Sequence, residues 1–319
     1  VSFLAFYNGR GIIERETVNH LISTNLLKSS DLDRWIENSK RSIKELAQRP
    51  LVRRYAGILS EYHAIDAAPF RVRKILIENH LEARLQYGGF SELFVMCPKH
   101  GMILASTDAE QKGEYRNNRE YFIRGQSHTY VQNIYYSGTL GQPAMTVGTP
   151  IRDGQKGLIA VLAARLDLKE LSGIMEQGRG LRSSEDTYLV NLSNYFVTEP
   201  RFGKDYALRR TVHTEGVKAG LSGKDGIGFY ENYRGIPVIG AYKWLPDFNL
   251  CLITEVDQAE AFAPIGELAW MIAGVSLAII LITVVASFFF ARTITRPISQ
   301  LVSGAKEIGH RIAVRQQRR

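Results

Sequence analysis

The chain has 319 residues, enough for about two domains. Its composition, 45% hydrophobic and 23% charged, is that of a globular protein and excludes collagen-like, low-complexity and disulfide-dense classes. The net charge is +8, and residues 292–319 carry most of it, with seven Lys and Arg against one Glu. The rest is nearly neutral, so no nucleic acid is expected as a partner. Cys97 and Cys251 lie far apart in strand-like segments and are expected to be buried free thiols.

Residues 1–7, VSFLAFY, are apolar but too short to span a bilayer. We interpret them as the remnant of a first transmembrane helix. The alternative is a short docking segment of a cleaved secretory form. Either interpretation places the central part of the chain outside the cytoplasm.

Residues 8–69 are predicted to form a long signalling helix. Apolar residues recur at steps of three and four in ERETVNHLISTNLL and SSDLDRWIENSKRSIKELAQ, and Ser30 or Asp31 is expected to cap a helix start. Pro50 predicts a break or kink, after which the pattern resumes.

A period of two follows, which is typical of strands. Residues 93–105 and 188–198 each fit two strands around a polar turn, and residues 146–167 and 238–257 each fit two further strands ending at an acidic residue. Matching pieces are separated by roughly 90 to 95 residues, as in an internal repeat. Two copies of one α+β module are therefore predicted, over residues 70–180 and 181–258.

Residues 268–291 carry no formal charge and exceed the roughly 20 residues that a membrane-spanning helix needs. A buried core helix of this length would carry a polar stripe. Arg292 and Arg296 flank the C-terminal end. By the positive-inside rule, residues 8–267 are expected to be periplasmic and residues from 292 onward cytoplasmic.

The sequence contains no HExxH, Cys-x-x-Cys, G-x-S-x-G or Walker pattern, and its histidines are scattered without ligand spacing. We therefore predict no catalytic residue, no metal and no cofactor here. The question of enzyme activity in a longer protein stays open.

The order of these parts resembles the double Cache sensor domain of bacterial transmembrane receptors, whose modules are PAS-like. Arg119-Glu120-Tyr121-Phe122 is similar to the family's R-x-Y-F or R-x-W-Y signature, and TPIRDG (149–154) and YRGIPVIGAYKWLP (233–246) are similar to its strand entries. Residues 292–319 resemble the start of a HAMP signal-relay module. The resemblance implies an α+β fold: a long N-terminal helix, a membrane-distal and a membrane-proximal antiparallel-sheet module, then a transmembrane helix. HAMP modules are parallel four-helix bundles of two chains, so it also implies a homodimer.

The resemblance further implies that a small molecule binds inside the distal module. Arg119 would offer a guanidinium, which pairs bidentately with a carboxylate, beside the rings of Tyr121 and Phe122. The alternative is that Arg119 caps a helix and the two rings are core. The candidate ligand-binding residues are Arg119, Tyr121, Phe122, Tyr136, Thr146, Arg165 and Asp167.

Amino-acid-sensing members of the family carry a tyrosine five residues before the arginine, a tryptophan two after it, and an aspartate on the late strand that receives the ammonium group. This chain has Glu114, Tyr121 and Arg165 at those places. Alternation along the strand predicts one face made of Ile159, Val161, Ala163, Arg165 and Asp167. Arg165 would lie at a pocket rim or form an ion pair with Asp167 or a helix carboxylate. Two arginines in the pocket would repel an α-amino group and favour an anion.

The sequence therefore predicts the extracytoplasmic ligand-sensing region of a signal-transduction receptor in a bacterial inner membrane. The receptor would be a two-component histidine kinase, a diguanylate cyclase or a chemoreceptor, and its ligand a small anionic metabolite such as an organic acid. An amino acid or amine is the alternative ligand. Outside this class, the alternatives are a membrane-anchored extracytoplasmic enzyme and a structural spacer. The aromatic segment 228–246 is expected to be core.

Overall fold

The computed structural model of the chain describes residues 2–62, 69–85, 89–138, 141–177, 182–290, 292 and 304. Contacts divide the chain into two units. Residues 15–260 form one unit, and residues 1–14 together with 261–319 form the other. The predicted HAMP segment, 292–319, lies outside the described residues except for 292 and 304.

A single helix, α1 (Ser2–Gln48), fills most of the predicted helical range. The expected caps Ser30 and Asp31 are wrong, because both lie inside α1. Leu32 and Ile36 are each 1% exposed, so the buried apolar stripe continues past the expected start. The break comes at Pro50, as predicted: Pro50 is the first residue of α2 (Pro50–Ser60), a position where the missing N–H costs no helix hydrogen bond.

The first sheet, which we call the distal sheet, is fully antiparallel with the order β2-β1-β5-β4-β3. Its strands are β1 (Phe90–Met96), β2 (Ile103–Ser106), β3 (Tyr130–Ser137), β4 (Gln142–Arg152) and β5 (Leu158–Leu166). The helices α3 (Phe70–Leu76), η1 (Ile77–Leu81) and α4 (Glu82–Leu85) precede it, and η2 (Ala109–Gln111), α5 (Glu120–Ile123) and η3 (Arg124–Gln126) lie between β2 and β3. The predicted strand pair within 93–105 is confirmed.

The second sheet, which we call the proximal sheet, follows α6 (Leu168–Glu176) and has the antiparallel order β6-β9-β8-β7. Its elements are β6 (Asp186–Asn191), α7 (Glu215–Leu221), β7 (Gly226–Glu231), β8 (Pro237–Leu245), η4 (Pro246–Phe248) and β9 (Leu250–Asp257). Gly148 pairs with Ala163 in the distal sheet, and Gly240 pairs with Glu255 in the proximal sheet. Both positions are offset by the same 92 residues (148 to 240, 163 to 255), which confirms the internal repeat.

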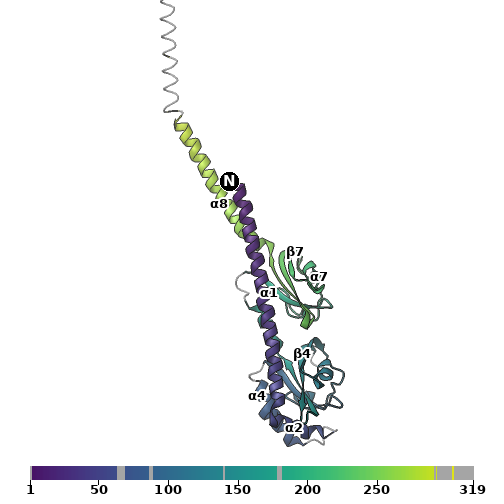
Figure 1. Cartoon of the computed structure of the whole chain (residues 1–319). Helices are drawn as coiled ribbons and strands as arrows, with labels where there is room; N and C mark the ends of the chain where they lie inside the picture. Colours follow the sequence, from purple (N-terminus) through teal and green to yellow (C-terminus); the bar gives the residue numbers. More distant parts are fainter. Residues whose placement is uncertain are drawn as a thin grey trace, which may run out of the picture. The chain divides into compact units, whose positions relative to one another are not determined.

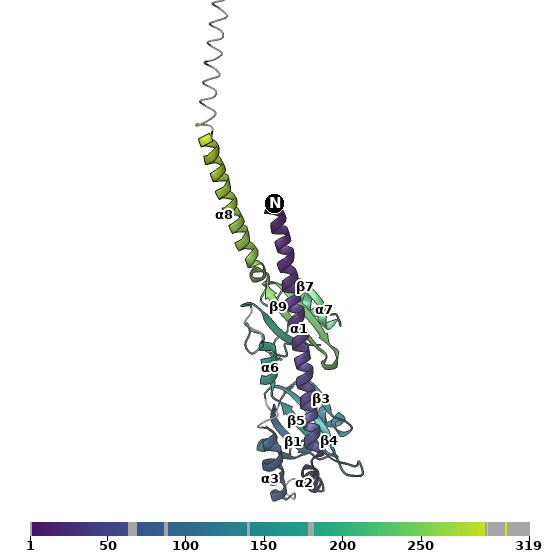
Figure 2. The ribbon, with the colours of Figure 1, turned by 60° about the vertical axis from the view of Figure 1, so that its left-hand side comes forward.

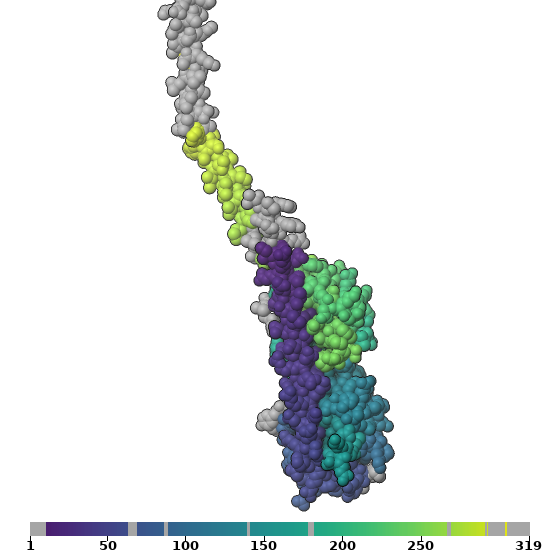
Figure 3. Space-filling view, in the orientation of Figure 1, coloured from purple at the N-terminus to yellow at the C-terminus, as the bar shows by residue number. Residues whose placement is uncertain are grey.

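The part of α1 within residues 15–48 runs beside both sheets (Figures 1 and 2) and stays visible along the surface (Figure 3). Its buried apolar residues, among them Leu32, Ile36 and Ile43, belong to one cluster that contains residues of both sheets. Beside the proximal sheet it adds polar contacts. His20 Nε2 lies 2.9 Å from Glu185, and Asn25 accepts a hydrogen bond from Thr254 at 2.6 Å. One helix therefore joins both sheets through a shared apolar cluster and adds hydrogen bonds to the proximal module.

Each sheet also has a core on its other face. Phe94, Tyr121 and Val161 belong to a buried cluster of the distal sheet, and Tyr188 and Phe196 to one of the proximal sheet. Cys97 and Cys251 are both buried free thiols, as predicted.

The unit that contains residues 261–319 is dominated by α8 (Gln258–Phe290). This helix of 33 residues is long and apolar enough to cross a membrane, by length and composition. Most of its large apolar side chains from Trp270 to Phe290 are exposed. The described part of the predicted span 268–291 lies within it.

Candidate functional site

The two faces of β5 differ as the alternation predicts. Val161 and Ala163 pack with Tyr121 and Phe122 on the face that we call the outer face of the distal sheet. Ala160, Leu162, Ala164 and Leu166 join the cluster on the helix side. Ile159 departs from the prediction and packs on the helix side, because the β4–β5 register shifts beside it.

The short helix α5 lies directly on the outer face because Gly148 has no side chain. A Cβ at Gly148 would overlap the carbonyl group of Tyr121. The backbone of α5 therefore approaches β4 more closely than any other residue at 148 would allow. This close approach fixes the position of Tyr121.

Tyr121 is the central side chain of this face, with 1% of its surface exposed. Its ring stands edge-on to Phe94, with centroids 6.0 Å apart, and stacks on Tyr135 at 6.5 Å. Its backbone N–H donates to Gln132 Oε1 at 3.3 Å. Burial, and then Tyr135, raise the pKa of its hydroxyl, while Arg116, Arg165 and Arg119 act in the opposite direction. Three guanidinium groups therefore act on this ring.

Arg119 occupies the N-cap position of α5 but makes no capping bond with its side chain. Its guanidinium carbon lies 5.4 Å from the ring centroid of Tyr135, a cation–π distance. Phe122 is 3% exposed. Arg119 thus stands at a helix start without capping it, the rings of Tyr121 and Phe122 are buried, and the guanidinium faces the ring of Tyr135.

A row of polar residues crosses the distal sheet beside these rings. Glu92 on β1 is opposite Arg165 on β5, Arg165 is opposite Thr146 on β4, and Thr146 is opposite Gln132 on β3. Thr146 Oγ1 lies 3.0 Å from the hydroxyl of Tyr135, which joins the row to the aromatic stack. The row therefore brings Thr146 and Arg165 close to Tyr121.

Arg165 forms an ion pair with Glu92, and neither side chain is more than 6% exposed. Ser106 Oγ also donates to Glu92 Oε1 at 2.8 Å. Burial raises the pKa of Glu92, while Arg165 and Ser106 act to lower it. The expected partner of Arg165, either Asp167 or a helix carboxylate, is wrong, because the partner is a carboxylate on the neighbouring strand.

Two candidate residues lie apart from this group. Tyr136 is 48% exposed, and its hydroxyl donates to the carbonyl of Gly141 at 2.7 Å. Asp167 is the N-cap of α6, where its carboxylate accepts a hydrogen bond from the backbone of Lys169 at 3.0 Å. Asp167 and Arg165 also line a cavity of about 720 Å³, together with residues of α6, residues 197–199 and the starts of β1 and β4.

Sequence reasoning missed Glu92, Gln132, Tyr135 and Arg116. Arg116 is 8% exposed and donates to Gln111 at 2.7 Å and to Glu114 at 3.3 Å. The sequence does hold a signal for Glu92. It directly precedes the apolar run LFVMC of a buried strand, where a carboxylate needs a partner. The other three can be assigned only when β3 is paired with β4 at the edge of the sheet and the loop before α5 is placed.

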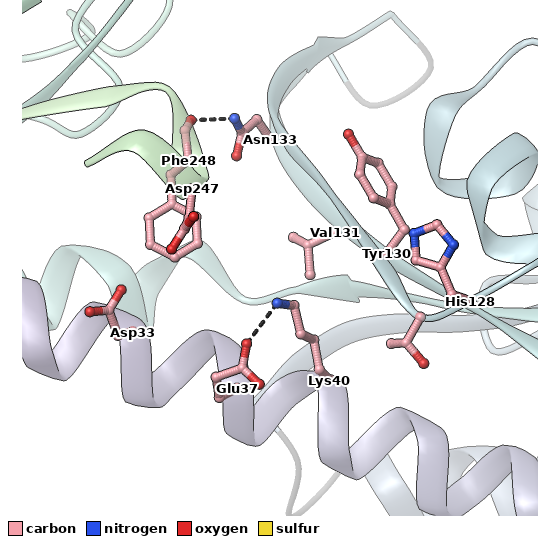
Figure 4. Close-up of a pocket in the computed structure, with 10 residues that line it drawn as sticks. Asp33, Glu37, Lys40, His128, Tyr130, Val131, Asn133, Asp247 and Phe248 are labelled. Atoms are coloured by element: carbon pink, nitrogen blue, oxygen red, sulfur yellow. Dashed lines mark hydrogen bonds and ion pairs between the residues drawn. The ribbon is translucent and has the colours of Figure 1, made fainter. Parts of the chain in front are cut away.

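Figure 4 shows a second cavity, of about 420 Å³, where α1, β3 and the η4 turn meet. Asn133 of β3 donates to the carbonyl of Phe248, which ties the distal sheet to the η4 turn of the proximal module. Burial and the neighbouring Asp247 raise the pKa of Asp33 on α1. This cavity lies at the junction of the two sheets, away from the outer face that holds Tyr121.

The fold defines a sensor of tandem antiparallel-sheet modules joined by a long helix. The chain belongs to the Cache domain family, whose model matches residues 11–265. Cache sensor domains are extracytoplasmic. A comparison with curated proteins finds no significant match.

Solved structures share this fold at low sequence identity. The sensor domain of the Vibrio cholerae histidine kinase DctB is 11% identical with a TM-score of 0.57, covering 76% of this chain and 98% of its own. The sensory domain of the Campylobacter jejuni chemoreceptor Tlp3 is 13% identical with a TM-score of 0.56. The match covers 79% of this chain and 97% of the Tlp3 domain. A third match is the ligand-binding domain of the Pseudomonas aeruginosa chemoreceptor PctC, solved in complex with GABA. It is 17% identical with a TM-score of 0.51, and the match covers 75% of this chain and 99% of the PctC domain.

Proposed function

We propose that this chain is the ligand-sensing region of a transmembrane receptor, and that its distal module binds a small carboxylate ligand at the outer face. The observation that carries the proposal is the charge around Tyr121. Three guanidinium groups act on its hydroxyl, and Glu92 pairs with one of them, Arg165. The net charge around this hydroxyl is therefore positive, which favours binding of an anion.

Arg119 is the residue best suited to hold the carboxylate. In the described part of the chain it makes no ion pair, whereas Arg165 pairs with Glu92 and Arg116 with Glu114. A guanidinium beside a tyrosine ring suits a planar carboxylate, because the fork donates two hydrogen bonds. One carboxylate of the ligand would bind Arg119. A second carboxylate could bind Arg165 only if the ion pair between Arg165 and Glu92 broke.

An amino acid is the second candidate, and Glu92 favours it. Its carboxyl lies buried on the same face, where it could accept an ammonium group in the role that the family gives to an aspartate. Fold neighbours were solved in complex with GABA, L-isoleucine and L-Arg. With an amino acid bound, the carboxylate of Glu92 contacts both the guanidinium of Arg165 and the ammonium group of the ligand.

We further propose the setting of the sensor. It lies outside the inner membrane of a bacterium as a homodimer, α8 crosses the membrane, and residues from 292 onward form the start of a cytoplasmic HAMP module. The modules span residues 70–180 and 181–258. The output is a histidine kinase, a diguanylate cyclase or a chemoreceptor.

Calorimetry of the full chain in lipid nanodiscs tests the ligand, with a panel of organic acids, amino acids and amines. Arg119→Ala should weaken an acid at least about tenfold, since one decade is about 1.4 kcal/mol and a lost charge-assisted contact costs more. Arg124→Ala is the matched control, because Arg124 ends the same short helix but lies over the ring of Tyr130. Equal loss in both variants, or a response to amines alone, contradicts the proposal.

A further inference from the structure

Two carboxyl groups lie side by side inside the proximal sheet. Asp186 on β6 and Glu255 on β9 are opposite each other across the strands, and each residue is 1% exposed. Neighbouring buried carboxyl groups resist double ionisation, because each charge loses hydration and repels the other. The pair therefore favours keeping a proton.

The internal repeat shows that the fold does not require this pair. At the offset of 92 residues the corresponding positions in the distal sheet are Phe94 and Ala163, which are also opposite each other. Both belong to the apolar cluster of the outer face. The proximal copy thus carries two carboxyl groups where the distal copy packs a ring against a methyl group.

Glu255 is 1% exposed and is surrounded by hydroxyl groups. Tyr188 donates to Glu255 Oε2 at 3.3 Å, while Glu255 Oε1 accepts no hydrogen bond from the described residues. The ring of Tyr230 fills the space beside the carboxyl, and it fits there because Gly240 and Gly216 carry no Cβ. This ring is one of the groups that bury the carboxyl group.

Charged and titratable groups approach the pair from several elements. Asp186 accepts a hydrogen bond from the hydroxyl of Tyr233 at 2.6 Å and another from the backbone of Arg201 at 2.8 Å. Arg234 attracts the ionised form of Glu255, but it is bound to Asp257 at 2.7 Å. In the described part of the chain, the charged and titratable groups that act on Glu255 are Asp186 and Tyr188 from β6, Tyr230 from β7, and Tyr233 and Arg234 from the turn before β8.

These surroundings make the charged form of Glu255 unfavourable, and the pKa of its carboxyl group is raised accordingly. Burial, and then the neighbouring Asp186, raise the pKa of Glu255 to about 8, against the attraction of Arg234 and the tyrosine hydroxyls. At neutral pH the group is therefore mainly protonated.

We propose that the Asp186–Glu255 pair is a proton-binding site that gives this sensor a second input, alkaline pH, independent of the ligand of the distal module. When the pH rises, the O–H bond of Glu255 breaks and its proton leaves to solvent, so that two negative charges face each other across β6 and β9. Their repulsion weakens the pairing of these strands. Because β9 ends at Asp257 and α8 begins at Gln258, the strand affected is the one that leads directly into α8.

Thermal unfolding of the full chain in lipid nanodiscs, from about pH 6 to about pH 9, tests the proposal. The wild type should lose about 5 °C in melting temperature as the pH approaches 8, because the folded state holds a proton that the unfolded state has released. Glu255→Gln, which keeps the shape of the neutral acid, should remove this loss. Glu231→Gln is the matched control, since Glu231 is exposed on β7, and it should melt as the wild type does.

Infrared spectroscopy of the wild type supplies a second measurement that needs no variant to fold. A protonated carboxylic acid band should be present at neutral pH and disappear near pH 8. Tyr188→Phe should move that transition to higher pH, because the ionised carboxylate loses a hydrogen bond. The proposal is overturned if the band is missing at neutral pH, or if Glu255→Gln folds and keeps the wild-type loss of melting temperature.

Discussion

Glu92 on β1 and Arg165 on β5 face each other across the distal sheet and form an ion pair in which both side chains are nearly inaccessible to solvent. The pair lies on the outer face, in the polar row that passes Thr146. It offsets one of the positive charges around Tyr121. In the binding site proposed above, Arg119 would then be the cation that a ligand contacts.

Glu92→Gln should destabilise the sensor by about 3 to 5 kcal/mol, because it leaves the guanidinium of Arg165 buried without its counter-ion. The exchanged pair Glu92→Arg with Arg165→Glu should recover part of this loss. Urea unfolding of the full chain in nanodiscs measures both. Asp205→Asn, which breaks the exposed pair with Arg209, should change little. Equal stability of Glu92→Gln and the wild type would show that the buried pair carries no net stabilisation.

Gly148→Ala should displace α5 and so lower both stability and ligand affinity. The added Cβ meets the backbone of Tyr121, which cannot rotate away, and overpacking of this kind costs about 1 to 3 kcal/mol. Gly154→Ala is the matched control, because a Cβ there meets no atom within 4 Å. The measurements are the melting temperature and the calorimetric affinity for the best ligand of the panel. Unchanged affinity in folded Gly148→Ala would place the ligand away from α5.

Features of this site that depend on neighbouring residues in the sequence could be predicted, and features that depend on the pairing of distant strands could not. The alternation of β5 is local, and it correctly separates Val161 from Leu162. Asp167 before an apolar helical pattern is also a local signal, typical of an N-cap, although it is among the residues predicted to bind the ligand. Local patterns of this kind give the elements and their faces.

Long-range pairing is not readable in the same way. The partner of Arg165 is 73 residues earlier, on a strand whose neighbour in the sheet cannot be read from alternation alone. The repeat does predict that β1 and β5 of the first module correspond to β6 and β9 of the second. It does not predict that Phe94 and Ala163 are replaced by Asp186 and Glu255, because side-chain chemistry can differ between copies that share one backbone.

The proposed topology predicts opposite outcomes for two reporter fusions. A reporter joined after residue 260 should behave as periplasmic, and one joined after residue 305 as cytoplasmic, since basic residues flank the C-terminal end of the apolar segment. Paired alkaline phosphatase and fluorescent protein fusions at each place provide the control, because they report opposite sides of the membrane. The reverse pattern would remove the sensor orientation proposed here.

Glu260 should make the sensor sensitive to acid. Its carboxylate accepts hydrogen bonds from the backbone N–H groups of Ser183 and Ser184, each at 2.7 Å, and from both hydroxyls. Partial burial raises the pKa of Glu260, but the bonds from Ser184 and Ser183 outweigh it and lower that pKa to about 2. The first turn of α8 is thereby bound to the residues that precede β6.

A carboxyl group whose pKa is lower in the folded state stabilises that state above its unfolded pKa, and the stabilisation is lost as the pH falls from about 4.5 to about 2. Glu260→Gln should therefore lower the melting temperature at neutral pH and reduce the fall in melting temperature across this acid range. Glu231→Gln, at an exposed position on β7, is the matched control and should keep the wild-type acid profile. If Glu260→Gln shows the same acid profile as the wild type, the hydrogen bonds to Ser183 and Ser184 do not contribute to the stability of the folded sensor.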